Sequence, residues 1–222
     1  MRLAIVGGTG KLGSGLAQRW ARAGHRIAIG SRDATKARAH AGAFESQGLP
    51  VQGGDNEWAA REGEVVVLTV PYAAHSDTVR GIAEALAGKV LVDTTVPLVP
   101  PKVSRVHLPA GLAAAIEAQG LVGPAVPVVA TLHHVSAAHL GDPAHAIQCD
   151  VLVAGDDAQA KALTMGLLRD LGLRGLDAGP LVNAIALESL TPVLIHMNRS
   201  YKSQGAGVVF TGLPGGWSSA DE

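Results

Sequence analysis

The chain has 222 residues, which is enough for one large α/β domain or for a larger and a smaller one. Apolar residues make up 47% of the sequence but aromatic residues only 3%, so the core must be built from Ala, Val, Leu and Ile, as in parallel sheets covered by helices. The formal net charge is -1 and the basic residues form no block, which argues against a nucleic-acid-binding protein.

Cysteine usage and hydropathy indicate a cytoplasmic protein. The single cysteine, Cys149, can form neither an intramolecular disulfide nor a thiolate metal cage, and Met1 leads into an expected strand rather than a signal peptide. The most apolar stretch, residues 121–132, is interrupted by glycine and proline and is too short to cross a bilayer. We therefore expect a cytoplasmic location and no membrane partner.

Short apolar runs, typical of buried strands, alternate with helical patterns from the first residues onward. The expected strands span residues 2–6, 26–29, 65–70 and 89–93, and the expected helices span 14–23, 33–44 and 73–87. Parallel strands joined through helices require right-handed crossovers. The sequence therefore predicts an α/β fold of the Rossmann type, a doubly wound parallel sheet with four strands in this part.

The second half of the chain continues the pattern after a proline-rich loop. The expected elements are a helix near 112–119, strands at 128–132, 149–154 and 173–176, a helix ending at 171, and a last helix over 181–203. Asp156 and Asp157 stand where they would cap the helix that ends at 171. Pro192 lacks the N–H that the helix interior uses, so it should either bend the last helix or lie where the missing donor is tolerated.

These elements divide the chain into two folded parts and a tail. We expect a Rossmann domain over residues 1–145, a small C-terminal α/β portion over 146–213 and a disordered tail over 214–222, which is rich in Gly, Ser and acid.

A glycine-rich turn between the first strand and the first helix carries the clearest chemical signal. Gly8, Gly10 and Gly13 form the pattern G-x-G-x-x-G, in which glycine permits a tight turn, close approach of the backbone to a pyrophosphate and close packing of helix on strand. The helix N-terminus adds a partial positive charge and free N–H groups. In this context the pattern predicts dinucleotide binding; the alternatives are a plain turn or a Rossmann domain that has lost its ligand.

The end of the second strand favours NADP over NAD. NAD-binding proteins place an acid there for the ribose hydroxyls, whereas this chain has Ser31 and Arg32, with Lys36 one helical turn farther on. A guanidinium matches a phosphate with two parallel hydrogen bonds. The alternative is that both cations are ordinary surface charges and that Asp33 reaches a ribose.

Two loops should border the ligand crevice, because they follow the carboxyl ends of the third and fourth strands. Val70 and Pro71 lie in the first loop and Pro97 in the second. We expect both loops to flank the ribose and nicotinamide, although such Val-Pro segments also serve as plain loop anchors.

Four histidines, His133, His134, His139 and His145, follow the strand at 128–132. Their spacing matches no metal-binding motif, so we expect no metal, and clustered loop histidines are more often solvated or hydrogen-bonded within the fold. His133 is the best candidate for chemistry, because it stands at the end of a strand that faces the crevice.

Over most of its length the sequence resembles a known family, the NADPH-dependent F420 reductases, also called F420:NADP oxidoreductases. The similar segments are GGTGKLGSGLA, GSRDATKA, LTVPY, DTTVPLVPP, LHHVSA, DVLVAGDD, LDAGPL, LESLTP and AGVVFTG, which cover the chain to about Leu213. The dinucleotide part is shared with many families, whereas LDAGPL, LESLTP and the LHHVSA loop are far more specific.

The resemblance implies reversible hydride transfer between NADPH and carbon 5 of the deazaflavin coenzyme F420, in a homodimer. It places Thr9, Gly10, Lys11 and Leu12 at the pyrophosphate, and Ser31, Arg32 and Lys36 at the 2'-phosphate. It also places His133 and Val135 beside the deazaflavin and nicotinamide rings, and Ser189 and Thr191 near the deazaflavin. The chain departs from some archaeal members at Ile185, where they carry arginine.

Stacking two planar rings in a dry cleft is mostly a problem of positioning, so apolar walls such as Val70, Pro97 and Val135 suit this reaction better than an acid/base pair. Two other functions stay open. One is a reductase of another small acceptor, such as an imine, carbonyl or chelated metal ion, which would oxidise NADPH without a deazaflavin. The other is a non-enzymatic NADP sensor, which would bind NADP without turnover.

Overall fold

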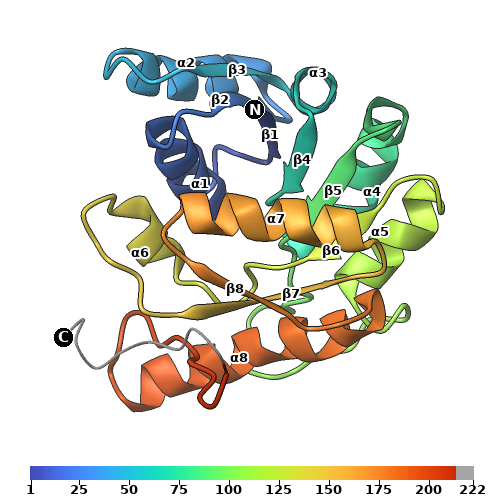
Figure 1. Ribbon diagram of the computed structural model, residues 1–222, viewed down its shortest axis with the longest axis vertical. Coiled ribbons are helices and arrows are strands. Elements are labelled where there is room, and N and C mark those ends of the chain that lie inside the picture. The colour runs from blue at the N-terminus through green and yellow to red at the C-terminus, as the bar shows by residue number, and fades with distance from the viewer. Residues whose placement is uncertain (214–222) are drawn as a thin grey trace.

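Residues 1–213, which the computed structural model describes, form one twisted sheet with helices on both faces (Figure 1). The strands are β1 (Arg2–Val6), β2 (Arg26–Ser31), β3 (Val51–Asp55), β4 (Val65–Leu68), β5 (Val90–Asp93), β6 (Val128–Ala130), β7 (Asp150–Gly155) and β8 (Arg174–Asp177). The helices are α1 (Lys11–Arg22), α2 (Ala34–Glu45), α3 (Asn56–Glu62), α4 (Tyr72–Ile82), α5 (Ala114–Val122), α6 (Ala137–Gly141), α7 (Ala158–Asp170) and α8 (Ala184–Ser200), with 3-10 turns η1 (Ala83–Leu86) and η2 (Leu181–Asn183).

The strand order is β3-β2-β1-β4-β5-β6-β7-β8, which confirms the doubly wound α/β fold. Strands β1 to β6 are parallel, β7 pairs antiparallel with β6, and β8 is a parallel partner of β7 at the edge. The C-terminal part thus adds its two strands to the same sheet. The division at residue 145 stays a prediction, and the expected tail, 214–222, lies outside the described residues.

Two apolar layers fill the space between sheet and helices. One face of the sheet packs on α1, α2 and α7, and α1 is tied to α7 by the buried indole of Trp20, whose Nε1 donates to the Leu167 carbonyl at 2.9 Å. The other face packs on α3, α4, α5 and α8. The alternation of strand side chains between the two faces, Leu3 and Ile5 toward one and Ala4 and Val6 toward the other, produces this arrangement.

Aspartates start three of the helices, as their short carboxylates suit the free N–H groups of a first turn. Asp33 caps α2, Asp55 caps α3, and Asp157 caps α7 through the Ala160 N–H at 2.7 Å. The predicted cap of α7 is therefore confirmed for Asp157, whereas Asp156 accepts a hydrogen bond from the Leu181 N–H instead.

The structure adds β3 and α3, which the sequence pattern did not predict. Strand β3 contains Gly53 and Gly54, which are unfavourable in isolated strands. Glycine is required at both positions by packing, because a Cβ on Gly53 would lie 2.2 Å from the carbonyl oxygen of Ala37 in α2, and one on Gly54 would lie 2.2 Å from the ring of Trp58 in α3. The short helix α6 was also not expected, and the predicted strands at 65–70 and 128–132 end two residues early.

Within residues 1–213, none of the helices combines the length and apolar character that crossing a bilayer requires.

Candidate active site

A cavity of about 670 Å³ lies at the carboxyl ends of the parallel strands. It lies where the strand order reverses between β1 and β4, the position at which doubly wound sheets bind their ligands. Its size falls within the range of small-molecule sites. Its lining comprises Gly7, Thr9, Gly10, Lys11, Leu12, Ser31, Arg32, Lys36, Asn56, Thr69, Val70, Pro71, Ala74, Thr78, Thr94, Thr95, Val96, Leu98, Leu132, His133, Val135 and Ala137.

The glycine-rich turn forms the floor at one end of this cavity. The Gly8 N–H donates to the carbonyl oxygens of Ile5 and Gly30, which holds the turn against β1 and β2. A Cβ on Gly13 would lie 2.6 Å from the Cα of Gly8, so helix and turn approach as closely as the sequence pattern predicts. Gly10, the N-cap of α1, has no side chain to satisfy the first N–H groups of that helix, which leaves them available to an anion.

Two exposed cations stand beside the turn. Arg32 and Lys36 line the cavity, and neither forms an ion pair with a carboxylate among the described residues. The carboxylate of Asp33 accepts hydrogen bonds from the N–H groups of Thr35 and Lys36 at 2.9 and 3.1 Å, so it is engaged in capping α2. Asp55, Glu57 and Asp77 line an adjoining pocket together with Arg32, but none of them pairs with it, so both cations are available to a phosphate.

Asn56 is a lining residue that was not predicted from the sequence. It follows β3 directly, and its Oδ1 accepts a hydrogen bond from the Gly7 N–H at 3.3 Å. The position of Asn56 at the carboxyl end of a parallel strand would have indicated a site residue, but β3 itself was not predicted. Thr94 and Thr95, at the end of β5, lie in a segment that was expected to border the crevice.

The opposite wall carries His133 and Val135, which are both buried. Neither ring nitrogen of His133 has a hydrogen-bond partner among the described residues, and the same holds for the Thr95 hydroxyl. Burial lowers the pKa of His133 to about 3, so the ring is neutral at physiological pH. Unpartnered polar atoms on a cavity wall fit a ligand that brings its own donors and acceptors, as a nicotinamide amide or a deazaflavin ring does.

Helix α8 supports this wall. The Thr191 hydroxyl donates to the main-chain carbonyl of His133 at 2.6 Å, whereas the Ser189 hydroxyl donates to Ile185 within the helix. Ser189 and Thr191 do not line the cavity. Thr191 thus contacts the main chain of the candidate residue His133 rather than the open space.

Glu188, on the same helix, joins α8 to α5. It is 2% exposed, and its two carboxylate oxygens accept from the N–H groups of Ala114 and Ala115 at 2.7 and 3.0 Å. The N-cap residue of α5, Ala113, has no polar side chain, so this carboxylate replaces a local cap. Burial, opposed by these two hydrogen bonds, raises the pKa of Glu188 to about 8.

A buried histidine–aspartate pair lies next to the lining residues Thr94 and Thr95. His75 and Asp93 are fully buried, with 2.7 Å between Nε2 and Oδ2, and the other Asp93 oxygen accepts from the Thr95 N–H. Burial by itself lowers the pKa of His75, but the hydrogen bond and charge of Asp93 outweigh it and raise the pKa. The pair fixes the segment that begins with Thr94 and Thr95.

The remaining histidines of the predicted cluster do not converge. The Nε2 of His134 is 2.8 Å from the Asp150 carbonyl, and the rings of His139 and His145 stack at 4.0 Å. Among the described residues, no group of three potential ligands is placed to hold a metal ion.

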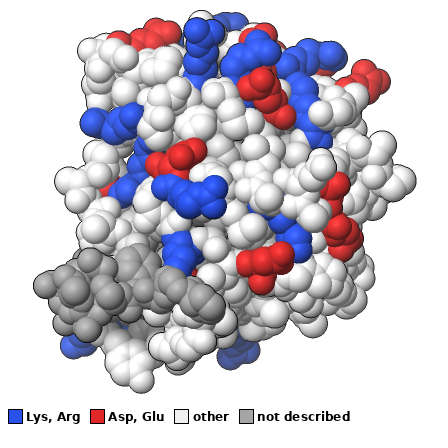
Figure 2. Space-filling model, in the orientation of Figure 1, with Lys and Arg blue, Asp and Glu red and all other residues white. Residues whose placement is uncertain are grey.

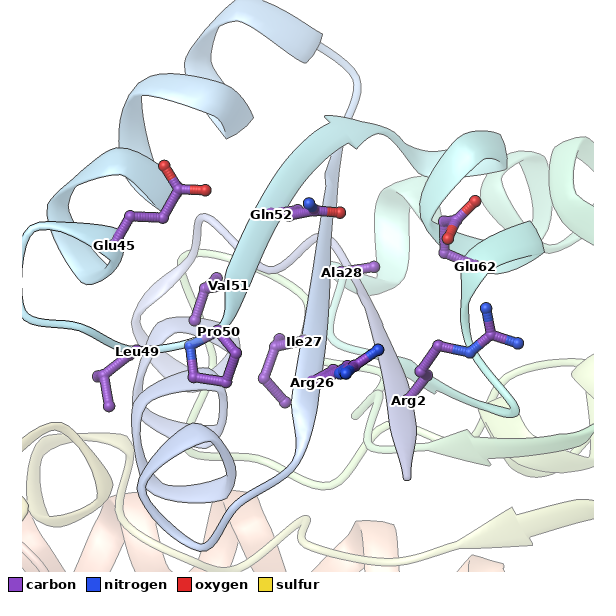
Figure 3. Close-up of a pocket in the computed structure, with 10 residues that line it drawn as sticks. All are labelled: Arg2, Arg26, Ile27, Ala28, Glu45, Leu49, Pro50, Val51, Gln52 and Glu62. Atoms are coloured by element: carbon purple, nitrogen blue, oxygen red, sulfur yellow. The ribbon is translucent and has the colours of Figure 1, made fainter.

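A second cavity of about 350 Å³ lies at the opposite ends of β1, β2 and β3 (Figure 3). Arg2 and Arg26, the first residues of β1 and β2, and Glu45 and Glu62 surround it. It contains none of the predicted site residues, so we assign the ligand site to the larger cavity.

Comparison with known proteins identifies the family. Residues 2–97 match a family model described as NADP oxidoreductase coenzyme F420-dependent. The F420-dependent NADP reductase of Methanothermobacter marburgensis is 40% identical to this chain, covering 96% of it and 100% of the relative. The chain belongs to the F420-dependent NADP reductase family.

Two further relatives of the family share its full length. The F420-dependent NADP reductase of Methanothermobacter thermautotrophicus is 38% identical over 96% of both chains. The crystal structure of a proposed F420-dependent NADP reductase from Arthrobacter sp. FB24 superposes with a TM-score of 0.79 at 32% identity, over 95% of this chain and 99% of that one.

The F420-dependent reductase fold brings most of the predicted site residues together. Around the cavity it gathers Thr9, Gly10, Lys11, Leu12, Ser31, Arg32, Lys36, Val70, Pro71, His133 and Val135. Gly8, in the turn, and Gly13, in the first turn of α1, do not line the cavity, and Pro97 is buried between the lining residues Val96 and Leu98.

Proposed function

We propose that this protein transfers a hydride reversibly between NADP(H) and the deazaflavin coenzyme F420. In the reducing direction NADPH, a proton and oxidised F420 give NADP⁺ and reduced F420, so each hydride is accompanied by one proton. The observation that carries the proposal is the single cavity in which the phosphate-binding elements and the His133 wall face each other, in a chain of this family.

One end of the cavity binds the phosphates of NADP(H). The free N–H groups at the start of α1, together with Thr9, Lys11 and Leu12, hold the pyrophosphate. Ser31, Arg32 and Lys36 hold the 2'-phosphate, because two cations and a hydroxyl favour it and an acid would repel it. The chain therefore prefers NADPH to NADH.

The other end positions the two rings. Val70, Pro71 and Val135 supply apolar contacts that exclude water, so the rings stack at the distance that hydride transfer requires. His133 stays neutral there, because burial lowers its pKa to about 3. It therefore orients a ring by hydrogen bonding, and the proton of the reaction comes from another source. Ser189 and Thr191 act from α8, with Thr191 fixing the His133 main chain.

The decisive experiment mixes the purified protein with NADPH and oxidised F420 and follows the F420 absorbance. We expect loss of that absorbance with NADPH and a much slower loss with NADH. NADPH binding without any change in F420 would overturn the proposal. It would favour a reductase of another acceptor if NADPH is oxidised by a small imine or carbonyl, and a sensor if it is not.

The resemblance to this family also leads us to propose a homodimer in the cytoplasm. Light scattering should give about twice the mass of the 22.6 kDa chain, and cell fractionation should recover the protein with cytoplasmic markers.

A further inference from the structure

The loop between β5 and α5 and the end of α8 carry exposed positive charge beyond the rim of the cavity. In residues 94–113 the only charged side chains of Lys, Arg, Asp or Glu are those of Lys102 and Arg105, and both are exposed. In residues 184–213 the only cations are Arg199 and Lys202, also exposed, and the only acid, Glu188, is buried. We call Lys102, Arg105, Arg199 and Lys202 the cationic rim.

One contact brings the two halves of the rim together. The Arg199 guanidinium donates to the hydroxyl of Ser104, which lies between the two cations of the loop, at 3.4 Å. Among residues 1–213, none of the four rim cations forms an ion pair with a carboxylate. In Figure 2 the lower edge of the molecule, where α8 runs in Figure 1, shows blue and no red side chains. The protein as a whole has a net charge of -1, so this surface is more positive than the rest of the molecule.

The rim is continuous with the wall of the cavity. Leu98 lines the cavity, and the chain turns immediately after it, with the Lys102 N–H donating to the Val99 carbonyl at 3.0 Å. On α8, Thr191 contacts His133 in the cavity wall, and Arg199 follows eight residues later, about 12 Å along the helix. A ligand whose ring lies against His133 would therefore extend its far end over the rim.

We propose that the cationic rim binds the anionic tail of F420. Beyond its ring and ribityl chain, this coenzyme carries a phosphodiester and then glutamate carboxylates, so its far end is a polyanion. Lysine and arginine attract such a group through charge and charge-assisted hydrogen bonds. The proposal rests on the proposed function and adds a second subsite to it. NADP(H) uses the cations at the opposite end, Lys11, Arg32 and Lys36, so two anionic ligands are held apart.

The test compares F420 with the tail-less deazaflavin, which has the ring and ribityl chain but neither phosphate nor glutamate. In the double variant Lys102→Glu/Arg105→Glu, the KM for F420 should rise about 3- to 10-fold, as expected for two exposed charge contacts that turn repulsive. The KM for the tail-less deazaflavin and for NADPH should stay within about twofold of the wild type, because neither ligand reaches the rim. For the wild type, added sodium chloride should raise the KM for F420 more than that for the tail-less compound.

Two control variants separate charge from shape. Arg26→Glu reverses an exposed cation at the far end of the sheet and should leave all three KM values unchanged (Figure 3). Ser104→Ala removes the contact to Arg199 without changing the charge, and it should raise the KM for F420 by less than the double variant does. An unchanged KM for F420 in the double variant, or an equal rise for F420 and the tail-less compound, would overturn the rim as a tail site. Absence of turnover with F420 itself in the wild type would instead overturn the proposed function.

Discussion

Arg32 places a guanidinium where the 2'-phosphate of NADP is proposed to lie, and no acid among the described residues pairs with it. The position of Arg32 directly after the second strand, and the resemblance to the family, both predict this role. The structure adds that the neighbouring alternative, Asp33, is occupied by the cap of α2.

We expect Arg32→Ala to raise the KM for NADPH about 10- to 100-fold and to leave the KM for NADH nearly unchanged, because a hydrogen-bonded charge pair with the extra phosphate is lost. Steady-state kinetics with both nucleotides measures this. Arg38→Ala, which removes an exposed arginine of α2 outside the cavity, is the matched control. Equal losses with NADPH and NADH would contradict the phosphate role.

Gly13 allows α1 to approach the turn. A Cβ there would lie 2.6 Å from Gly8 Cα and 2.7 Å from the Thr69 hydroxyl. We expect Gly13→Ala to lower the free energy of unfolding by about 1–3 kcal/mol and to weaken NADPH binding, because turn and helix must separate. Gly42→Ala in α2, where a Cβ meets nothing within 4 Å, should instead be neutral or slightly stabilising. Urea unfolding measures the stability of both variants. Equal stabilities of Gly13→Ala and Gly42→Ala would show that the close approach is not required.

At the scale of elements, polar contacts join α8 to α5 and to the loop after β6. Glu188 caps α5 from a distance of 74 residues in sequence, and Thr191 holds the loop after β6. Strand pairing positions the parallel strands, but these two contacts set where α8 lies relative to the cavity.

We expect Glu188→Ala to lower the free energy of unfolding by about 1–3 kcal/mol, because two N–H groups of α5 lose their acceptors inside the protein. We also expect the KM for F420 to rise while that for NADPH stays close to the wild type, since α8 contacts the cavity wall at His133, away from the phosphate-binding turn. Glu188→Gln retains an acceptor and should keep most of both properties. A loss of NADPH affinity in Glu188→Ala as large as that for F420 would argue for general unfolding instead.

At the scale of the whole molecule, buried titratable groups set how stability depends on pH. Burial raises the pKa of Glu188 to about 8, so between about pH 5 and 8 the folded protein keeps a proton that the unfolded chain releases, and stability falls as pH rises. The raised pKa of His75 also makes the stability fall as pH rises. Burial lowers the pKa of His133 to about 3, so below about pH 6.5 the unfolded chain binds a proton that the folded protein excludes, and stability falls as pH drops.

We therefore expect the free energy of unfolding to pass through a maximum near about pH 6. Urea unfolding between pH 4 and 9 measures the profile. Glu188→Gln should flatten the decline on the alkaline side and His133→Gln that on the acidic side. A profile that both variants leave unchanged would assign the pH dependence to other groups.

Local patterns in the sequence were sufficient for most of the fold. Apolar runs at strand spacing, the glycine-rich turn and the capping aspartates each act on their near neighbours, so the doubly wound fold class and a strand at the position of β8 were predicted correctly. Strand β3 was missed because its glycines are chosen by contacts with Ala37 and Trp58, in two different helices. Because β3 was not predicted, Asn56, which follows it directly and lines the cavity, was not predicted as a site residue either.

By itself, the sequence determined the fold class, the turn at Gly8 to Gly13, the cations at Arg32 and Lys36 and the candidacy of His133, since each depends on residue type and short spacing. Only the tertiary structure decided that Thr191 holds the main chain of His133, that Glu188 caps α5 and that Arg199 meets the loop at Ser104. Those contacts join residues 58 to 95 positions apart, and their partners are chosen by the packing of helices on a common sheet, which no local pattern encodes.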